Sequence, residues 1–119
     1  MESINIYTYL DYRALIRDLF TQKKKENRHF SYRFFARKAG FSSPNFLKLV
    51  IDGLRNVTNE SVSKIAKGFE MKKNEREFFE NMVYMNQSNS HDEKNHYYKK
   101  MMAARGYSKV RKMDKPTFE

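Results

Sequence analysis

Cysteine is absent from this 119-residue chain, and proline and glycine are scarce, with two and four residues respectively. The absence of cysteine excludes disulfides, thiolate zinc sites and thiol nucleophiles. No apolar run approaches the roughly 20 residues that a helix needs to span a bilayer. The first five residues do not form a basic segment followed by an apolar one, so we expect no secretory signal and no membrane partner. The expected compartment is the cytoplasm.

Groups that would carry enzymatic chemistry are also scarce. All four glycines fall at or near the ends of predicted helices, so no glycine-rich phosphate loop is present. His91 and His96 are five residues apart and do not share a helical face as metal ligands would, so they are interpreted, like His29, as surface residues. Glu75 and Glu77 belong to a predicted first helical turn, where the helix dipole explains them. We therefore expect no enzymatic activity, no metal and no cofactor.

The chain is rich in aromatic residues and in positive charge. Ten Phe and eight Tyr compensate for a modest hydrophobic content of 39% and allow one compact core. The net charge is +10, and most of it lies in residues 21–56, which hold nine basic and two acidic residues. Residues 91–119 hold eight basic and four acidic residues. A clustered positive charge is typical of a surface that binds a polyanion; a solvated face that only aids solubility is the alternative.

The spacing of apolar residues predicts helices throughout, because apolar side chains recur every three or four positions and no alternating strand pattern occurs. The first helix follows the cap Asp11, and the second runs from Ser31 to Ala39 and ends at Gly40. The third is predicted from Ser43 to Asp52 and the fourth from Thr58 to Phe69. A fifth helix is capped by Asn74 and followed by a loop over 86–89.

A sixth helix begins at Ser90, which is spaced from Glu93 as in a capping box, and is predicted to stop at Gly106. The expected fold is an all-α bundle of five to six helices. We divide it into a first unit over residues 1–89 and a C-terminal helix with a basic tail or linker over residues 90–119. The stripe of Tyr97, Tyr98, Met101 and Met102 is interpreted as core packing, with a dimer contact or a docking face for another domain or partner as alternatives.

The stretch from Ser31 to Gly53 has the plan of a helix-turn-helix, in which two short helices are joined by a glycine turn. Its segment Phe35 to Ser42, FARKAGFS, resembles the lambda-repressor-like helix-turn-helix family. Asp52 to Asn56, DGLRN, resembles the Gly-basic-basic turn that follows the recognition helix in that family. The resemblance implies DNA binding and transcriptional regulation by analogy with the fold.

A narrower resemblance covers nearly the whole chain, about Tyr7 to Lys112. Phe30 to Pro44 and Phe46 to Gly53 are similar to the N-terminal domain of a family of uncharacterised bacterial proteins. In that family the helix-turn-helix precedes a longer helical domain of unknown function. Two features depart from the repressor-like pattern. One residue more than usual separates Gly40 from Gly53, so the recognition helix or its exit turn is longer than in most repressors, and Leu54 stands where a basic residue is commoner.

In the predicted third helix, the polar residues available to contact bases in the major groove are few. Asn45 and Lys48 share one face with Asp52, and Asn pairs well with adenine and Lys with guanine. Ser43 is the third candidate for base contact, although Ser42 or Ser43 is expected to cap the helix. Candidate phosphate contacts flank this helix: Arg33, Arg37, Lys38, Ser42, Arg55 and Asn56.

The function predicted from the sequence is therefore sequence-specific binding of double-stranded DNA by a transcriptional regulator, as a homodimer that contacts two half-sites. The alternative is a helical protein–protein interaction module that has a repressor-like fold but does not bind DNA. That alternative rests on the apolar character of the third helix and on the negative charge of Asp52, which repels phosphate. Salt dependence separates the two, because phosphate contacts release counterions.

Overall fold

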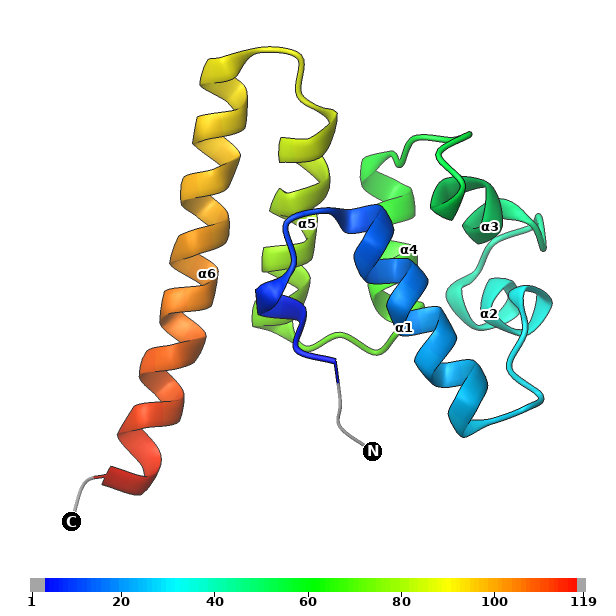
Figure 1. Cartoon of the computed structure of the whole chain (residues 1–119), viewed down its shortest axis with the longest axis horizontal. Coiled ribbons are helices and arrows are strands. Elements are labelled where there is room, and N and C mark those ends of the chain that lie inside the picture. The colour runs from blue at the N-terminus through cyan, green and yellow to red at the C-terminus, as the bar shows by residue number, and fades with distance from the viewer. Residues whose placement is uncertain (1–3, 118–119) are drawn as a thin grey trace.

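The computed structural model describes the backbone of residues 4–117 and the side chains of residues 4–106. Within that part the chain forms helices and no strand, so the predicted all-α class is confirmed there (Figure 1). A short 3₁₀ turn, η1, precedes six α-helices in chain order: η1 (Ile6–Thr8), α1 (Tyr12–Glu26), α2 (Tyr32–Ala39), α3 (Phe46–Ile51), α4 (Asn59–Gly68), α5 (Lys73–Gln87) and α6 (His91–Thr117). No helix among the described residues is long and apolar enough to cross a membrane.

The helices α1, α2 and α4 begin where the sequence predicts, because a polar side chain caps each of them. The side chains of Asp11, Ser31 and Thr58 accept hydrogen bonds from backbone N–H groups two or three residues further on, at 3.0–3.2 Å. These bonds satisfy donors that have no partner within the first turn. Gly40 follows α2 with a φ of 94°, the left-handed conformation that the glycine was expected to supply.

The helix α3 is shorter than predicted. It covers Phe46–Ile51 rather than the range from Ser43 to Asp52, and Asn45 is its N-cap residue. Ser43 precedes a proline, which disfavours the helical conformation, and its Oγ instead accepts a hydrogen bond from the Asn45 N–H at 3.3 Å. At the other end, Gly53 adopts a φ of 82° and terminates the helix.

The helix α5 extends further than predicted at both ends. It begins at Lys73, with Lys72 as its N-cap residue, rather than after Asn74, because the Glu75 carboxylate accepts a hydrogen bond from the Lys72 backbone N–H at 2.9 Å. It continues through Gln87 into the segment predicted as a loop. The amides of Asn86 and Gln87 bind backbone groups of distant segments, which stabilises the last turn.

The helix α6 runs through Gly106 to Thr117, so the predicted stop at Gly106 is wrong. A glycine in a regular helical conformation costs only about 1 kcal/mol, which is not enough to end a long helix. Its start agrees with the sequence, since the Ser90 Oγ accepts a hydrogen bond from the Glu93 N–H at 3.1 Å. The side chains of the basic tail predicted over 107–119 lie outside the described residues.

Figure 1 shows α5 and α6 side by side and antiparallel, with α2 and α3 on the far side of the molecule from α6. In the predicted C-terminal stripe, Met101 is fully buried, Met102 and Tyr97 are partly buried, and Tyr98 is 42% exposed. Met101 and Ala104 join the same core as Phe78 of α5. The division predicted after residue 89 falls in the connection between α5 and α6.

The core is built around aromatic rings and a close contact between α2 and α4. The rings of Phe35 in α2 and Phe69 after α4 lie 4.6 Å apart, and both are buried. Gly68, the last residue of α4, lies beneath Phe35; a Cβ at this position would be 2.5 Å from Phe35 Cε1. Gly68 is one of the four glycines expected at or near the ends of helices, and the structure adds a packing reason for a glycine at this position.

Candidate nucleic-acid interface

The unit formed by α2, the turn after it and α3 is held together by backbone bonds and stacked rings. The N–H groups of Gly40 and Phe41 both donate to the Ala36 carbonyl, at 2.9 and 2.8 Å, and thereby reverse the chain after α2. The Phe41 ring stacks on that of Phe46, the first residue of α3, with ring centroids 4.6 Å apart. Leu47 and Val50 of α3 are buried, and α3 packs against α1 and α2. The opposite side of α3 therefore faces outwards.

Two of the predicted base-contacting residues lie on that outward side. Asn45 is exposed and makes no capping hydrogen bond, so its side-chain amide keeps its donors and acceptor available. Lys48, one turn further along, has 54% of its side chain exposed. The structure thus brings the two residues to the same surface that the spacing predicted.

Lys48 already has a partner in the absence of DNA. Its Nζ lies 2.8 Å from Oδ2 of Asp52, four residues later on the same helix face. The hydrogen bond to Asp52 and the charge of its carboxylate raise the pKa of Lys48 above its ordinary value. The Asp52 carboxylate would have to turn away for Lys48 to donate to a base or a phosphate.

The two serines before α3 differ in their surroundings. Both are exposed. Ser43 Oγ accepts the bond from Asn45 described above, so it shapes the turn rather than capping α3, whose N-cap residue is Asn45. Within residues 4–106, Ser42 makes no hydrogen bond through its hydroxyl and can still donate to a phosphate oxygen.

On α2, the three predicted phosphate contacts fall into two groups. Arg33 and Arg37, one turn apart, are exposed and make no ion pair or hydrogen bond through their side chains within residues 4–106. Lys38 instead forms an ion pair with Glu70, with Nζ and Oε2 2.7 Å apart, and this ion pair lowers the pKa of the Glu70 carboxyl group. The unpaired arginines are therefore the stronger candidates for contact with an anion.

In the turn that follows α3 in the sequence, Arg55 and Asn56 are both exposed. The Arg55 guanidinium lies over the Phe46 ring, 5.4 Å from its centroid, and Lys64 lies over the Phe41 ring at the same distance. Each of the two stacked rings thus has one cation over it. Lys64 was not among the residues predicted from the sequence, because its nearness to Phe41 depends on how α4 packs.

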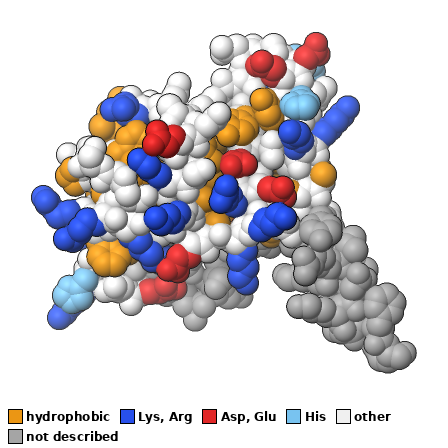
Figure 2. Space-filling view, turned by 180° about the vertical axis from the view of Figure 1, so that it is seen from behind, with side chains coloured by type: hydrophobic (Ala, Val, Ile, Leu, Met, Phe, Trp, Pro, Cys, Tyr) orange, Lys and Arg blue, Asp and Glu red, His pale blue; other side chains and the backbone are white. Residues whose placement is uncertain are grey.

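Positively charged side chains occur on several parts of the surface, including the part that carries these residues. Figure 2, viewed from behind, shows Lys and Arg side chains projecting from its left-hand edge, the side on which α2 and α3 lie. Leu54 stands beside Arg55 and is 70% exposed, so the position where a basic residue is commoner adds apolar surface instead.

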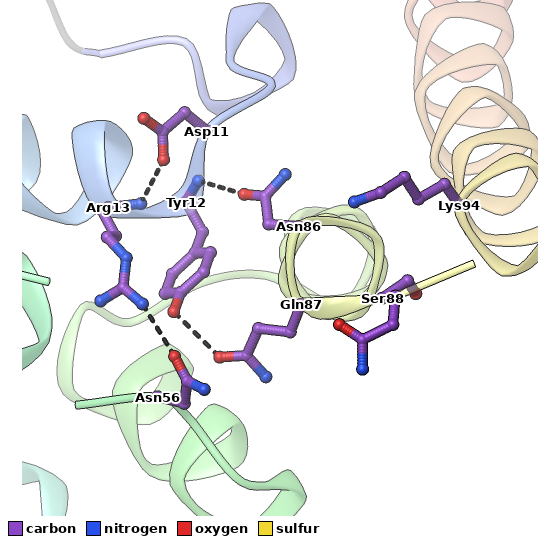
Figure 3. Close-up of a pocket in the computed structure, with 9 residues that line it drawn as sticks. Asp11, Tyr12, Arg13, Asn56, Asn86, Gln87, Ser88 and Lys94 are labelled. Atoms are coloured by element: carbon purple, nitrogen blue, oxygen red, sulfur yellow. Dashed lines mark hydrogen bonds between the residues drawn. The ribbon is translucent and has the colours of Figure 1, made fainter. Parts of the chain in front are cut away.

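A polar hollow of about 550 Å³ lies between the start of α1, the connection from α3 to α4 and the junction of α5 and α6 (Figure 3). Most of its lining groups are already paired with protein atoms. The Tyr12 hydroxyl donates to Gln87 Oε1 at 2.9 Å, and the Lys94 Nζ donates to the Met85 carbonyl at 3.2 Å. The polar groups around the hollow therefore serve mainly to connect the neighbouring helices. The part of the chain that the structure describes also holds no group of three or more residues arranged to bind a metal ion.

Comparison with known proteins found no match: not among protein-family models, not among curated proteins, and not among solved structures.

Proposed function

We propose that this protein binds double-stranded DNA through a helix-turn-helix formed by α2 and α3 and acts as a transcriptional regulator, without enzymatic activity. The observation that carries the proposal is the outward side of α3, which offers Asn45 and Lys48 while Leu47 and Val50 anchor the helix in the core. An amide and an ammonium group on one exposed helix face can pair with base edges in a major groove.

The charges around α3 support the same proposal. Arg33 and Arg37 are exposed without an acidic partner in the described side chains, and the guanidinium of Arg55 lies over the ring of Phe46, the first residue of α3. Cations in these places would contact phosphates and fix the position of the protein on the duplex. The left-handed Gly40 and the buried α2 residues agree with the resemblance of this segment to repressor-like proteins.

The test is a titration of the whole chain with duplex DNA of random sequence, followed by mobility shift or fluorescence anisotropy at about 50 and 200 mM salt. Counting Arg33, Arg37 and Arg55 as the cationic phosphate contacts of one copy, affinity is expected to fall by roughly fortyfold between these salt concentrations, and by roughly a thousandfold if two copies bind together. The absence of binding at low salt would overturn the proposal. In that case, salt-independent binding of a protein partner would favour an interaction module in its place.

Replacing Asn45 or Lys48 by Ala is expected to relax sequence preference at one or two base pairs. Each loss should cost about 1–3 kcal/mol against the preferred sequence. Asn45→Ala should leave binding to unrelated sequences almost unchanged, whereas Lys48→Ala also removes a positive charge and should weaken it. Selection of preferred sites from a random pool, repeated with each variant, measures this directly. If the preferred DNA sequence is unchanged in both variants, α3 is not the helix that contacts the bases.

Replacing Asp52 by Asn is expected to strengthen DNA binding, because it removes a carboxylate that repels phosphate and frees Lys48 from its ion pair. The slope of log affinity against log salt should steepen by about 1. Glu80→Gln is the matched control, since Glu80 also pairs with a cation four residues away on its helix, in α5. Equal effects of the two changes would mean that only the net charge matters.

We also propose that two copies act together. The helix α3 spans only six residues, which limits the base pairs that one copy can contact. Two copies bound to half-sites about 34 Å apart would contact more base pairs and so bind the DNA more tightly than one copy can. Light scattering of the complex with DNA carrying two half-sites tests this, and a one-to-one complex would exclude it.

A further inference from the structure

We infer that Arg13, in the first turn of α1, positions α3 for contact with base edges and the amide of Asn56 for contact with DNA phosphate. The inference rests on the proposed function, and it assigns a role to a residue that lies outside the helix-turn-helix segment. Arg13 is 37 to 43 residues away in sequence from the atoms that it binds.

The Arg13 guanidinium joins three groups of the segment that follows α3. Its Nη1 donates to the Val50 carbonyl in the last turn of α3, and to the Arg55 carbonyl at 3.0 Å. Its Nη2 donates to Oδ1 of Asn56 at 2.9 Å (Figure 3). A planar guanidinium holds its donors in a fixed fork, so three acceptors bound to it are also fixed relative to one another.

The Arg13 side chain is itself restrained. Its guanidinium carbon lies 4.9 Å from the centroid of the Tyr12 ring, and the Tyr12 hydroxyl is bonded to Gln87 of α5. The Tyr12 backbone N–H is bonded to Asn86 of the same helix at 2.9 Å. The turn after α3 is therefore tied through Arg13 to the fixed junction of α1 and α5.

This arrangement determines which end of the Asn56 amide remains available. Oδ1 accepts the bond from Arg13, so Nδ2 points away from the guanidinium, as Figure 3 shows. Within residues 4–106, Nδ2 makes no hydrogen bond, and Asn56 is exposed. A phosphate oxygen accepts hydrogen bonds, so an Asn56 held with its NH₂ group free is suited to bind one.

Arg13 acts through Asn56 and α3 and does not contact the DNA itself. Its donors are directed at protein carbonyl and amide oxygens, and its side chain is only partly exposed. A direct phosphate contact would add about 1 to the salt slope, whereas a positioning residue changes affinity for the preferred sequence and leaves the slope unchanged. These two roles can therefore be separated by measurement.

The experiment compares the whole wild-type chain with Arg13→Lys, Arg13→Ala and Arg17→Ala. Lys keeps the charge but cannot hold three acceptors in one plane. Arg17 is the matched control, because it lies one turn further along α1 and its side chain pairs, within residues 4–106, only with the neighbouring Asp18, with Nε and Oδ1 3.4 Å apart. For each variant, hydrogen exchange is measured without DNA, and affinities for preferred and random duplexes are measured over a range of salt.

Hydrogen exchange tests the structural half of the inference whether or not DNA binds. The amides of Gly53 and Leu54 donate to carbonyls of α3, and that of Val57 donates to Gln87 Oε1, so they report on this turn. Both Arg13 variants are expected to exchange these amides about tenfold faster, while Arg17→Ala leaves them unchanged. Unchanged exchange in Arg13→Lys and Arg13→Ala would overturn the inference, even if the wild-type chain binds DNA.

The binding data test the functional half. Both Arg13 variants should lower the ratio of specific to random affinity about tenfold, which is what one well-placed contact contributes. Arg13→Lys should keep the salt slope of the wild-type chain. Asn56→Asp completes the set, because Oδ1 still accepts from Arg13 while the free donor is lost. It should keep the protected amides and bind all duplexes more weakly. Failure of the wild-type chain to bind any duplex would instead refute the proposed function.

Discussion

Gly68→Ala is expected to lower the free energy of unfolding by about 1–3 kcal/mol, the usual cost of forcing extra volume into a packed core. A Cβ at Gly68 would lie 2.5 Å from Cε1 and 2.7 Å from Cζ of Phe35, and 3.0 Å from Cβ of Ala39. The Phe35 ring is fully buried and lies against Phe69, so it cannot move aside without displacing other rings. The helices α2 and α4 would have to separate.

The measurement is urea denaturation followed by circular dichroism at a helical wavelength. Gly106→Ala is the control, since Gly106 is an exposed helical residue and a Cβ there would meet nothing within 4 Å. That change should raise stability by about 0.5–1 kcal/mol, because Ala is the better helix former. Replacing glycine by alanine is thus expected to lower the free energy of unfolding at residue 68 and to raise it at residue 106. A stabilising Gly68→Ala would contradict the prediction, because it would show that the Phe35 ring moves aside.

The double change Arg33→Ala, Arg37→Ala is expected to weaken binding to every duplex alike. Neither arginine has an acidic partner within residues 4–106, so both are available to phosphate. Losing two phosphate contacts should lower the salt slope by about 2 and leave the preferred sequence unchanged. Fluorescence anisotropy with preferred and random duplexes at several salt concentrations measures both quantities.

The control is Lys99→Ala, Lys100→Ala, which removes the same charge from exposed positions on α6, far from α2 in Figure 1. If the two double variants weaken binding equally, the DNA is attracted by overall charge and α2 has no special place in the interface. A loss confined to Arg33 and Arg37 would support the proposed docking of α2 beside the phosphate backbone.

The features that the sequence predicts well depend on nearby residues. Three helices are capped by Asp11, Ser31 and Thr58 through hydrogen bonds that span two or three residues, so the start of each helix is determined by residues close to it in the sequence. The exposure of Asn45 and Lys48 likewise follows from the spacing of Leu47 and Val50. The ion pair between Lys48 and Asp52 joins positions four apart, a spacing at which opposite charges meet on a helix.

The features that the sequence does not predict depend on distant contacts. The last turn of α5 persists because Asn86 and Gln87 bind backbone groups of residues 10, 12 and 57, which no local pattern reveals. The role of Arg13 depends on acceptors at least 37 residues away. The late start of α3 is the exception, since Ser43 before a proline is a local signal that apolar spacing alone overlooks.

The hydrogen bonds of the Gln87 side-chain amide affect how cooperatively the protein unfolds. It donates to the Val57 carbonyl, accepts from the Val57 N–H and also accepts from the Tyr12 hydroxyl, all within 2.9 Å. One side chain near the end of α5 therefore closes two chain loops at once. Neither the segment that contains α3 nor the start of α1 can detach while this amide stays in place, so the fold should melt in a single cooperative step, and a fragment ending before residue 87 should not hold it.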